Sequence, residues 1–322
     1  MAQPLRPSPP VAAPPNGGSD APQEDWTTPA LAKGSLAHIQ PLLGSVNDQP
    51  TYTMELLAVQ WRPGDEIDLY VIKPKGVKKP PVVIYLYGYP AETDVFRDDR
   101  YDQAVTKDGF AAVGFVAALT GHRYHDRPMK EWFVSELQES LATSAHDVQM
   151  LIDYLATRDD LDMNRVGFFG HGAGASIGIL ASAVDPRIKV LQAIDPWGDW
   201  PTWMATSPFP PENERPNFVK PEFLKKVATL EPADWLPKVQ AKRFRFQQTA
   251  FDKITPASSK DKLRAAVPPG AEVTVYKTPD EYNAVMIGGK QLDWMRNALR
   301  SLPEAASDKT TADSKAPTVS SK

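Results

Sequence analysis

The sequence predicts an α/β protein built on a mostly parallel, eight-stranded sheet with helices on both faces. Short β-rich runs alternate with helical segments through the second half of the chain, an order typical of parallel strands joined by crossover helices. Several of these runs are continuously apolar, as expected for strands that are covered on both faces. With 322 residues, 42% of them hydrophobic, the chain is long enough to bury a large core.

The expected elements follow one another along the whole chain. Strands are predicted over residues 51–61, 66–74, 81–89, 110–119, 165–170, 188–195, 242–251 and 271–278. The first two alternate apolar and polar residues, which suits an antiparallel edge. Helices are predicted over 134–158, 173–184 and 290–299; the first of these places Leu137, Leu141 and Val148 at helical spacing.

One domain over 31–302 is expected between two disordered tails. The tails, 1–30 and 303–322, are rich in Pro and small polar residues and show no apolar period. Within the domain, a segment at about 196–240 is dense in Pro and Trp and interrupts the alternation of strands and helices. It is predicted to be an insertion, or lid, over the carboxyl edge of the sheet, where open α/β sheets bind their ligands.

Composition excludes several classes of function. A net charge of −4 without any Lys/Arg-rich run gives no basic surface for nucleic acid, and the apolar stretches are shorter than the roughly 20 residues of a membrane span. The chain has no Cys, and neither a metal cluster nor a cofactor is predicted. We expect a soluble protein. No signal peptide follows the first Met, but the Pro-rich leader is of a kind that often remains after an export signal is removed, so an exported form stays open.

The stretch "VGFFGHGAGASIGIL", residues 166–180, has the order strand, glycine turn, helix. Residues 170–174 fill the five positions of a GxSxG motif, with Gly172 where that motif has serine. This stretch resembles the nucleophile elbow of the α/β-hydrolase superfamily. The likeness extends from about residue 50 to 300 and is nearest to dienelactone hydrolases, acetylxylan esterases and the prolyl-oligopeptidase-like group. It implies an α/β-hydrolase fold.

The resemblance also implies positions for a catalytic triad. Gly172 takes the nucleophile position, Asp252 in "QQTAFDKITP" the acid position, and Tyr282 in "YKTPDEYNAV" the histidine position. A glycine has no oxygen that can attack a carbonyl, and a tyrosine with a reference pKa near 10 is a poor base at neutral pH. The resemblance therefore implies a hydrolase-like protein that lacks ordinary serine-hydrolase activity. The residues alone also allow Asp252 to be a turn-forming cap.

A ligand pocket is the part of the site that the resemblance leaves intact. It implies an oxyanion hole from the backbone N–H groups of Tyr89 and Ala173, and a ligand that is a small ester, carboxylate or aromatic molecule. The expected lining residues are Tyr87, His171, Trp197 and Trp200. For His171, and for the tryptophans that recur every third residue to Trp203, packing within the fold is the competing interpretation.

Three other functions remain open from the sequence. An active carboxylester hydrolase or peptidase would need an unconventional nucleophile such as water, with His122 or His125 as a surrogate base. An NAD(P)-binding protein is suggested by a GxGxxA pattern at residues 170–175 followed by Asp195, but four predicted strands precede this strand and glycine turn, which a dinucleotide fold would place at its first strand. A scaffold acting through its Pro-rich tail is the third.

Overall fold

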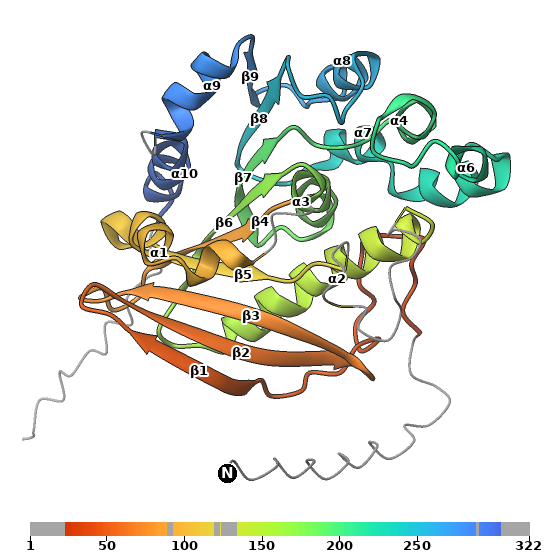
Figure 1. Ribbon diagram of the computed structural model, residues 1–322. Coiled ribbons are helices and arrows are strands. Elements are labelled where there is room, and N and C mark those ends of the chain that lie inside the picture. The colour runs from red at the N-terminus through yellow and green to blue at the C-terminus, as the bar shows by residue number, and fades with distance from the viewer. Residues whose placement is uncertain (1–22, 89–92, 119–122, 124–133, 288–289, 304–322) are drawn as a thin grey trace, which may run out of the picture.

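Nine strands form a single sheet in the computed structural model, which describes residues 23–88, 93–118, 123, 134–287 and 290–303 (Figure 1). Their order across the sheet is β1-β2-β3-β5-β4-β6-β7-β8-β9. The strands are β1 (Leu42–Asp48), β2 (Tyr52–Arg62), β3 (Asp65–Pro74), β4 (Pro81–Leu86), β5 (Ala111–Phe115), β6 (Asp162–His171), β7 (Ile188–Ile194), β8 (Arg243–Thr249) and β9 (Glu272–Tyr276). In this order, neighbouring strands pair in parallel from β5 through β4, β6, β7 and β8 to β9. The strands β1, β2 and β3 pair antiparallel with one another at the other end of the sheet, and β3 also pairs antiparallel with β5.

All eight predicted strands are present, but the predicted number was one too low. The missed strand is β1, which pairs antiparallel with β2 over a register that shifts between Leu43 and Ser45. Its sequence, LLGSVND, leaves Leu42 72% and Leu43 61% exposed. An edge strand that is exposed on both sides has neither the alternation nor the continuous apolar run that marks a strand in a sequence.

Helices cover both faces of the sheet, as predicted. The longer ones are α1 (Asp99–Thr106), α2 (Leu137–Ala156), α3 (Ala173–Val184), α8 (Ala257–Ala265), α9 (Pro279–Met286) and α10 (Lys290–Arg300). β4 is buried along its whole length, and its alternate residues enter two different cores. Val82 and Ile84 join α2 and α3 in one core, while Val83 and Tyr85 join α1 and α10 in the other.

The predicted insertion lies between β7 and β8 and consists of short helices. These are α4 (Trp200–Thr206), α5 (Arg215–Phe218), α6 (Pro221–Val227) and α7 (Pro232–Trp235), drawn in teal in Figure 1. Glu231 joins two of them, because its carboxylate accepts the backbone N–H groups of Asp199, Trp200 and Ala233 at 2.7, 2.8 and 3.2 Å. The buried Glu231 side chain thereby ties the beginning of α4 to the beginning of α7.

The N-terminal tail was predicted to reach residue 30, and this boundary is too late. Glu24 forms an ion pair with Arg62 of β2, and Pro29 accepts a hydrogen bond from Gln149 of α2. These long-range contacts have no local sequence pattern, which is why composition alone placed residues 24–30 in the tail. Residues 1–22 and 304–322 of the predicted tails lie outside the described residues.

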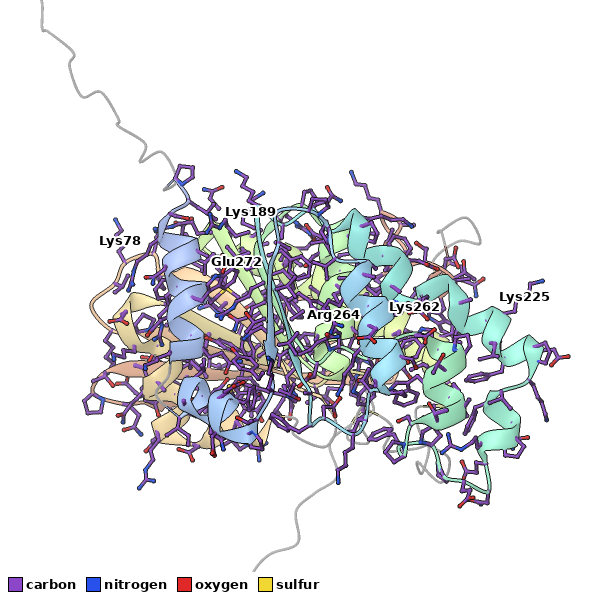
Figure 2. All side chains as sticks on the ribbon, turned by 90° about the horizontal axis from the view of Figure 1, so that it is seen from above. Lys78, Lys189, Lys225, Lys262, Arg264 and Glu272 are labelled. Atoms are coloured by element: carbon purple, nitrogen blue, oxygen red, sulfur yellow. The ribbon has the colours of Figure 1, made fainter. Side chains whose placement is uncertain are left out.

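Charged side chains project around the periphery. In Figure 2 the labelled Lys78 and Lys225 lie at opposite sides of the molecule. Among the helices that the structure describes, none combines the length and the apolar character needed to cross a membrane.

Candidate functional site

Gly172 stands at the turn between β6 and α3, where the sequence predicts an elbow. Its backbone has φ 57° and ψ −124°, a conformation that is costly for any residue with a side chain. The Gly172 N–H donates to Ile194 O of the neighbouring strand at 2.9 Å, and its carbonyl accepts the N–H of Ala175 at 3.0 Å. The turn is therefore held from both sides by main-chain hydrogen bonds.

The glycines around position 172 are required by close backbone contacts. A Cβ at Gly170 would lie 2.5 Å from Gly174 O, and one at Gly174 would overlap the carbonyl of Leu86. A Cβ at Gly88, just beyond β4, would lie 3.2 Å from Ala173 N. Strand β4, the turn and the first residues of α3 are thus in direct contact through their backbones.

The space above Gly172 itself is open enough for a side chain. A Cβ there would meet nothing closer than Trp197 Nε1, at 3.4 Å, which is ordinary van der Waals contact. Trp197 is in turn held by Ser176 of α3, whose hydroxyl donates to Trp197 O and accepts from Trp197 N, both at 2.8 Å. Position 172 is therefore limited by backbone strain, not by lack of room.

Of the two predicted oxyanion donors, one can be placed. Ala173 is the first residue of α3, so its N–H has no acceptor within the helix and lies where the helix dipole favours an anion. Tyr89 lies outside the described residues, as do His122 and His125.

Asp252 follows β8, at the position predicted for the triad acid. Its two carboxylate oxygens accept the N–H groups of Ile254 and Thr255 at 2.9 and 3.0 Å, so it also caps its own turn. Lys260 of α8 fixes this turn, since its ammonium donates to Asp252 O at 2.6 Å and to Thr249 O at 2.9 Å. Asp252 therefore caps its own turn, which is the alternative role that the sequence allowed.

His171 immediately precedes the elbow glycine. Burial lowers the pKa of its imidazole, and the nearby charge of Asp252 partly opposes this shift. Among the described residues the imidazole forms no hydrogen bond with a protein group. It is accordingly a neutral side chain at physiological pH, placed beside both Gly172 and the Asp252 carboxylate.

Tyr282 lies on α9, where the resemblance implies histidine. Its ring contacts Tyr276 and Phe251 with centroids at 5.4 and 6.0 Å. Burial, reinforced by the charge of Asp195, raises the pKa of the Tyr282 phenol to about 12. The phenol keeps its proton at neutral pH, so it is able to donate a hydrogen bond and is poorly suited to act as a general base.

Asp195 contributes a second carboxyl group that the resemblance did not assign to the hydrolase site. It directly follows β7 and has φ 45°, and its two oxygens accept the N–H and the hydroxyl of Thr249 at 2.6 and 2.8 Å. Burial raises the pKa of Asp195 to about 6. Position alone gave a signal for it, because a polar residue that closes a buried parallel strand lies at the edge where ligands bind.

The remaining predicted lining residues differ in their surroundings. The Tyr87 hydroxyl lies 2.8 Å from the Tyr101 hydroxyl, and burial raises the Tyr87 pKa to about 12. Trp200 is fully buried in α4 and donates its indole N–H to Leu230 O at 3.2 Å. Trp200 therefore packs the insertion onto the core, which is the competing interpretation of these tryptophans.

Neither a metal nor a dinucleotide is favoured by this geometry. Within the described part of the chain, no group of three or more His, Asp or Glu side chains is arranged to hold a metal ion. The Asp195 carboxylate, which an NAD(P) interpretation would give to a ribose, is already occupied by Thr249.

Comparisons with known proteins agree on the architecture. No protein-family model matches the chain, and no curated protein matches its sequence. Among solved structures it is similar to an acetyl xylan esterase from Paenibacillus sp. R4, with a TM-score of 0.57 and 16% identity over 78% of this chain and 87% of that one. It is also similar to a putative dienelactone hydrolase from Klebsiella pneumoniae subsp. pneumoniae MGH 78578, with a TM-score of 0.53 and 16% identity over 78% and 99%.

A third similar structure is the acylaminoacyl peptidase of Pyrococcus horikoshii, with a TM-score of 0.58 and 14% identity. The match covers 84% of this chain but 51% of that larger protein. Identities this low establish architecture and leave activity undecided. Together with the strand order and the turn at Gly172, they show that the chain has the α/β-hydrolase fold.

Proposed function

We propose that this protein binds a small ester, carboxylate or aromatic ligand at the carboxyl edge of its sheet without forming an acyl-enzyme. The observation that supports this best is Gly172, which has the backbone conformation of a strained turn but no side-chain oxygen. Tyr282, whose phenol stays protonated, offers no general base in the position where one would be needed.

Electrostatics of the site favour an acceptor oxygen on the ligand. The Ala173 N–H at the start of α3 has no acceptor within the helix and is a donor next to the open space at Gly172. A ligand carboxylate or ester carbonyl placed there would accept from this side, with the ring of Tyr282 as an apolar and hydrogen-bonding wall.

The test is a fluorophosphonate probe combined with a double reversion. The native chain should remain unlabelled, whereas Gly172→Ser with Tyr282→His should label and show burst kinetics on short acyl esters. Each single variant serves as the matched control, because the proposal assigns one missing group to each position. Labelling of any serine in the native chain would overturn it.

A second candidate, ester hydrolysis by water, is favoured by one observation. The neutral His171 imidazole lies beside the Asp252 carboxylate and next to the open space at Gly172. In this function His171 would take a proton from water, which would attack the ester carbonyl and release acid and alcohol. His171→Gln would then abolish turnover that the native chain shows without burst, whereas binding alone requires no turnover.

A further inference from the structure

Residues 24–31, called here the strap, run along α2 before the first strand. The carbonyl of Pro29 accepts from Gln149 Nε2 at 2.8 Å, and the N–H of Leu31 donates to Gln149 Oε1 at 3.1 Å. Leu31 is also half-buried against the core on that face of the sheet. The strap is therefore an ordered part of the fold that depends on a few side chains of α2.

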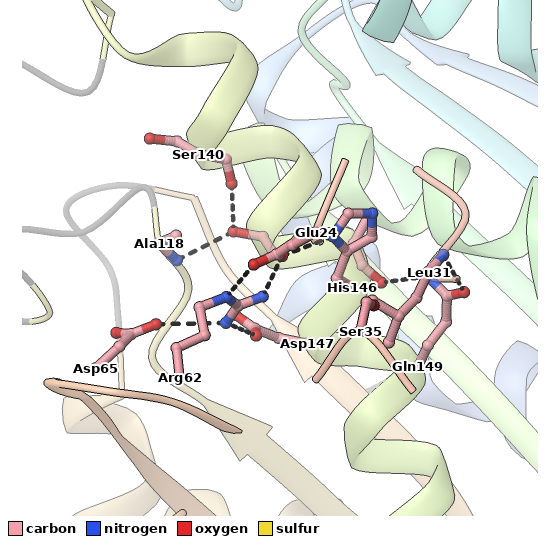
Figure 3. A network of polar contacts seen from close by, with 12 residues as sticks. Glu24, Leu31, Ser35, Arg62, Asp65, Ala118, Ser140, His146, Asp147 and Gln149 are labelled. Atoms are coloured by element: carbon pink, nitrogen blue, oxygen red, sulfur yellow. Dashed lines mark hydrogen bonds and ion pairs between the residues drawn. The ribbon is translucent and has the colours of Figure 1, made fainter. Parts of the chain in front are cut away.

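His146 of α2 is the most buried of these side chains, with no exposed surface. Its Nε2 lies 3.0 Å from Thr28 O, and its Nδ1 lies 2.7 Å from a carboxylate oxygen of Glu24 (Figure 3). A carbonyl can only accept a hydrogen bond, and so can an ionised carboxylate. Both contacts are hydrogen bonds only if both ring nitrogens carry hydrogen, which means that His146 is an imidazolium.

The proton cannot reside on Glu24 instead. Arg62 grips this carboxylate with two hydrogen bonds, from Nε at 2.7 Å and from Nη2 at 2.6 Å. Burial alone would raise the pKa of Glu24, but the bonds from Arg62 and His146 lower it to about 2. Glu24 is thus ionised throughout the physiological range, and the hydrogen in the contact belongs to His146.

Charges of both signs surround this pair. Asp25 comes from the strap, Asp65 from β3 and Asp147 from α2, while Arg62 comes from β2 and Arg123 from the segment after β5. Arg62 donates to Asp147 at 2.6 Å, and Arg123 bonds both Asp147 and Asp65. The arginines are fixed charges, so the imidazolium of His146 is the donor in this cluster whose charge is not permanent.

We propose that the imidazolium of His146 is a proton-dependent latch that holds the strap on α2. When the imidazole loses its proton, one ring nitrogen presents a lone pair to either Thr28 O or the Glu24 carboxylate. Two acceptors then face each other at a ring that has no exposed surface, and the strap loses one charge-assisted hydrogen bond. Residues 24–31 separate from α2 as the pH rises, while the sheet and the elbow stay folded.

Hydrogen exchange of the full chain tests this proposal. Between roughly pH 6 and pH 9, and after correction for intrinsic rates, protection of strap amides such as Leu31 should fall about tenfold, the size expected for one hydrogen bond to a charged group. In His146→Gln, which keeps the side-chain size but cannot donate from both ends, strap protection should be low at both pH values. His38→Gln is the matched control, because His38 is exposed.

Direct titration of the imidazole keeps the test decisive if His146→Gln folds poorly. The chain has five histidines, so their ring signals can be followed one by one by NMR, with assignment by single substitution. The His146 signal should change over the same pH range as strap protection. Strap protection that does not depend on pH, or a His146 ring that is neutral while the strap is protected, would overturn the proposal.

Discussion

The indole nitrogen of Trp197 lies 3.4 Å from the position that a Cβ on Gly172 would occupy. A side chain can therefore enter this space without displacing a neighbour, and it would place its first polar atom near an N–H donor. The backbone conformation is unfavourable for a residue with a side chain, because φ at Gly172 is 57°.

Replacing Gly172 by serine is expected to destabilise the protein without unfolding it. The positive φ should cost about 1 to 3 kcal/mol, measured as the loss of unfolding free energy in urea. Gly172→Ala is the matched control, since it meets the same strain without the hydroxyl, and the difference between the two variants reports what the hydroxyl contributes. Stabilisation by both substitutions would contradict a strained turn.

Replacing Gly174 by alanine should be more damaging than replacing Gly172. The new methyl group would overlap the carbonyl of Leu86, so β4 and α3 would have to move apart. We expect a loss of about 3 kcal/mol or more, against about 1 kcal/mol for Gly270→Ala, where φ is 90° but no atom lies within 4 Å. Equal losses for the two variants would show that the contact between β4 and α3 is not tight.

Asp195 should make the stability of the protein depend on pH in a definite direction. Because burial raises its pKa to about 6, the unfolded chain releases this proton at lower pH than the folded one. The contribution of Asp195 is fully present below about pH 4, declines as the pH rises toward 6 and is constant above that value.

Substitution isolates this effect. In Asp195→Asn, the decline in unfolding free energy between about pH 4 and pH 6 should be smaller, by up to about 3 kcal/mol for a shift of roughly two pH units. Chemical denaturation at a series of pH values measures it, with Asp252→Asn as the comparison. An unchanged pH profile would mean that the carboxyl group titrates normally.

Glu231 should control how firmly the insertion is held. Glu231→Ala leaves the buried N–H groups of Asp199 and Trp200 without their acceptors, at a cost of at least about 2 kcal/mol. Hydrogen exchange should rise over α4 and α7 together, while Glu231→Gln, which keeps one acceptor oxygen, should show a smaller change. Faster exchange in only one of the two helices would contradict the prediction that Glu231 holds both.

The parts of the fold that were predicted from sequence are those with local patterns. The elbow follows from the spacing of Gly170, Gly172 and Gly174, and α3 begins at Ala173 as predicted because that spacing fixes where the strand must turn. The continuous apolar run of β4 likewise announces a strand covered on both faces.

The parts that were missed depend on residues far apart in the chain. Asp195 meets Thr249 across two neighbouring strands, and Glu24 meets His146 over 122 positions. The sequence around Asp195 or Glu24 does not indicate which residue each acid contacts, because these contacts form only in the folded chain. The same is true of Lys260, whose ammonium fixes the turn that holds Asp252.

The contacts of Gly170, Gly174 and Gly88 have a consequence for the history of this chain. They hold the shape of the turn from outside position 172, so this shape does not depend on a side chain at that position. Selection for folding alone is then enough to preserve the geometry of this turn, whichever residue stands at position 172.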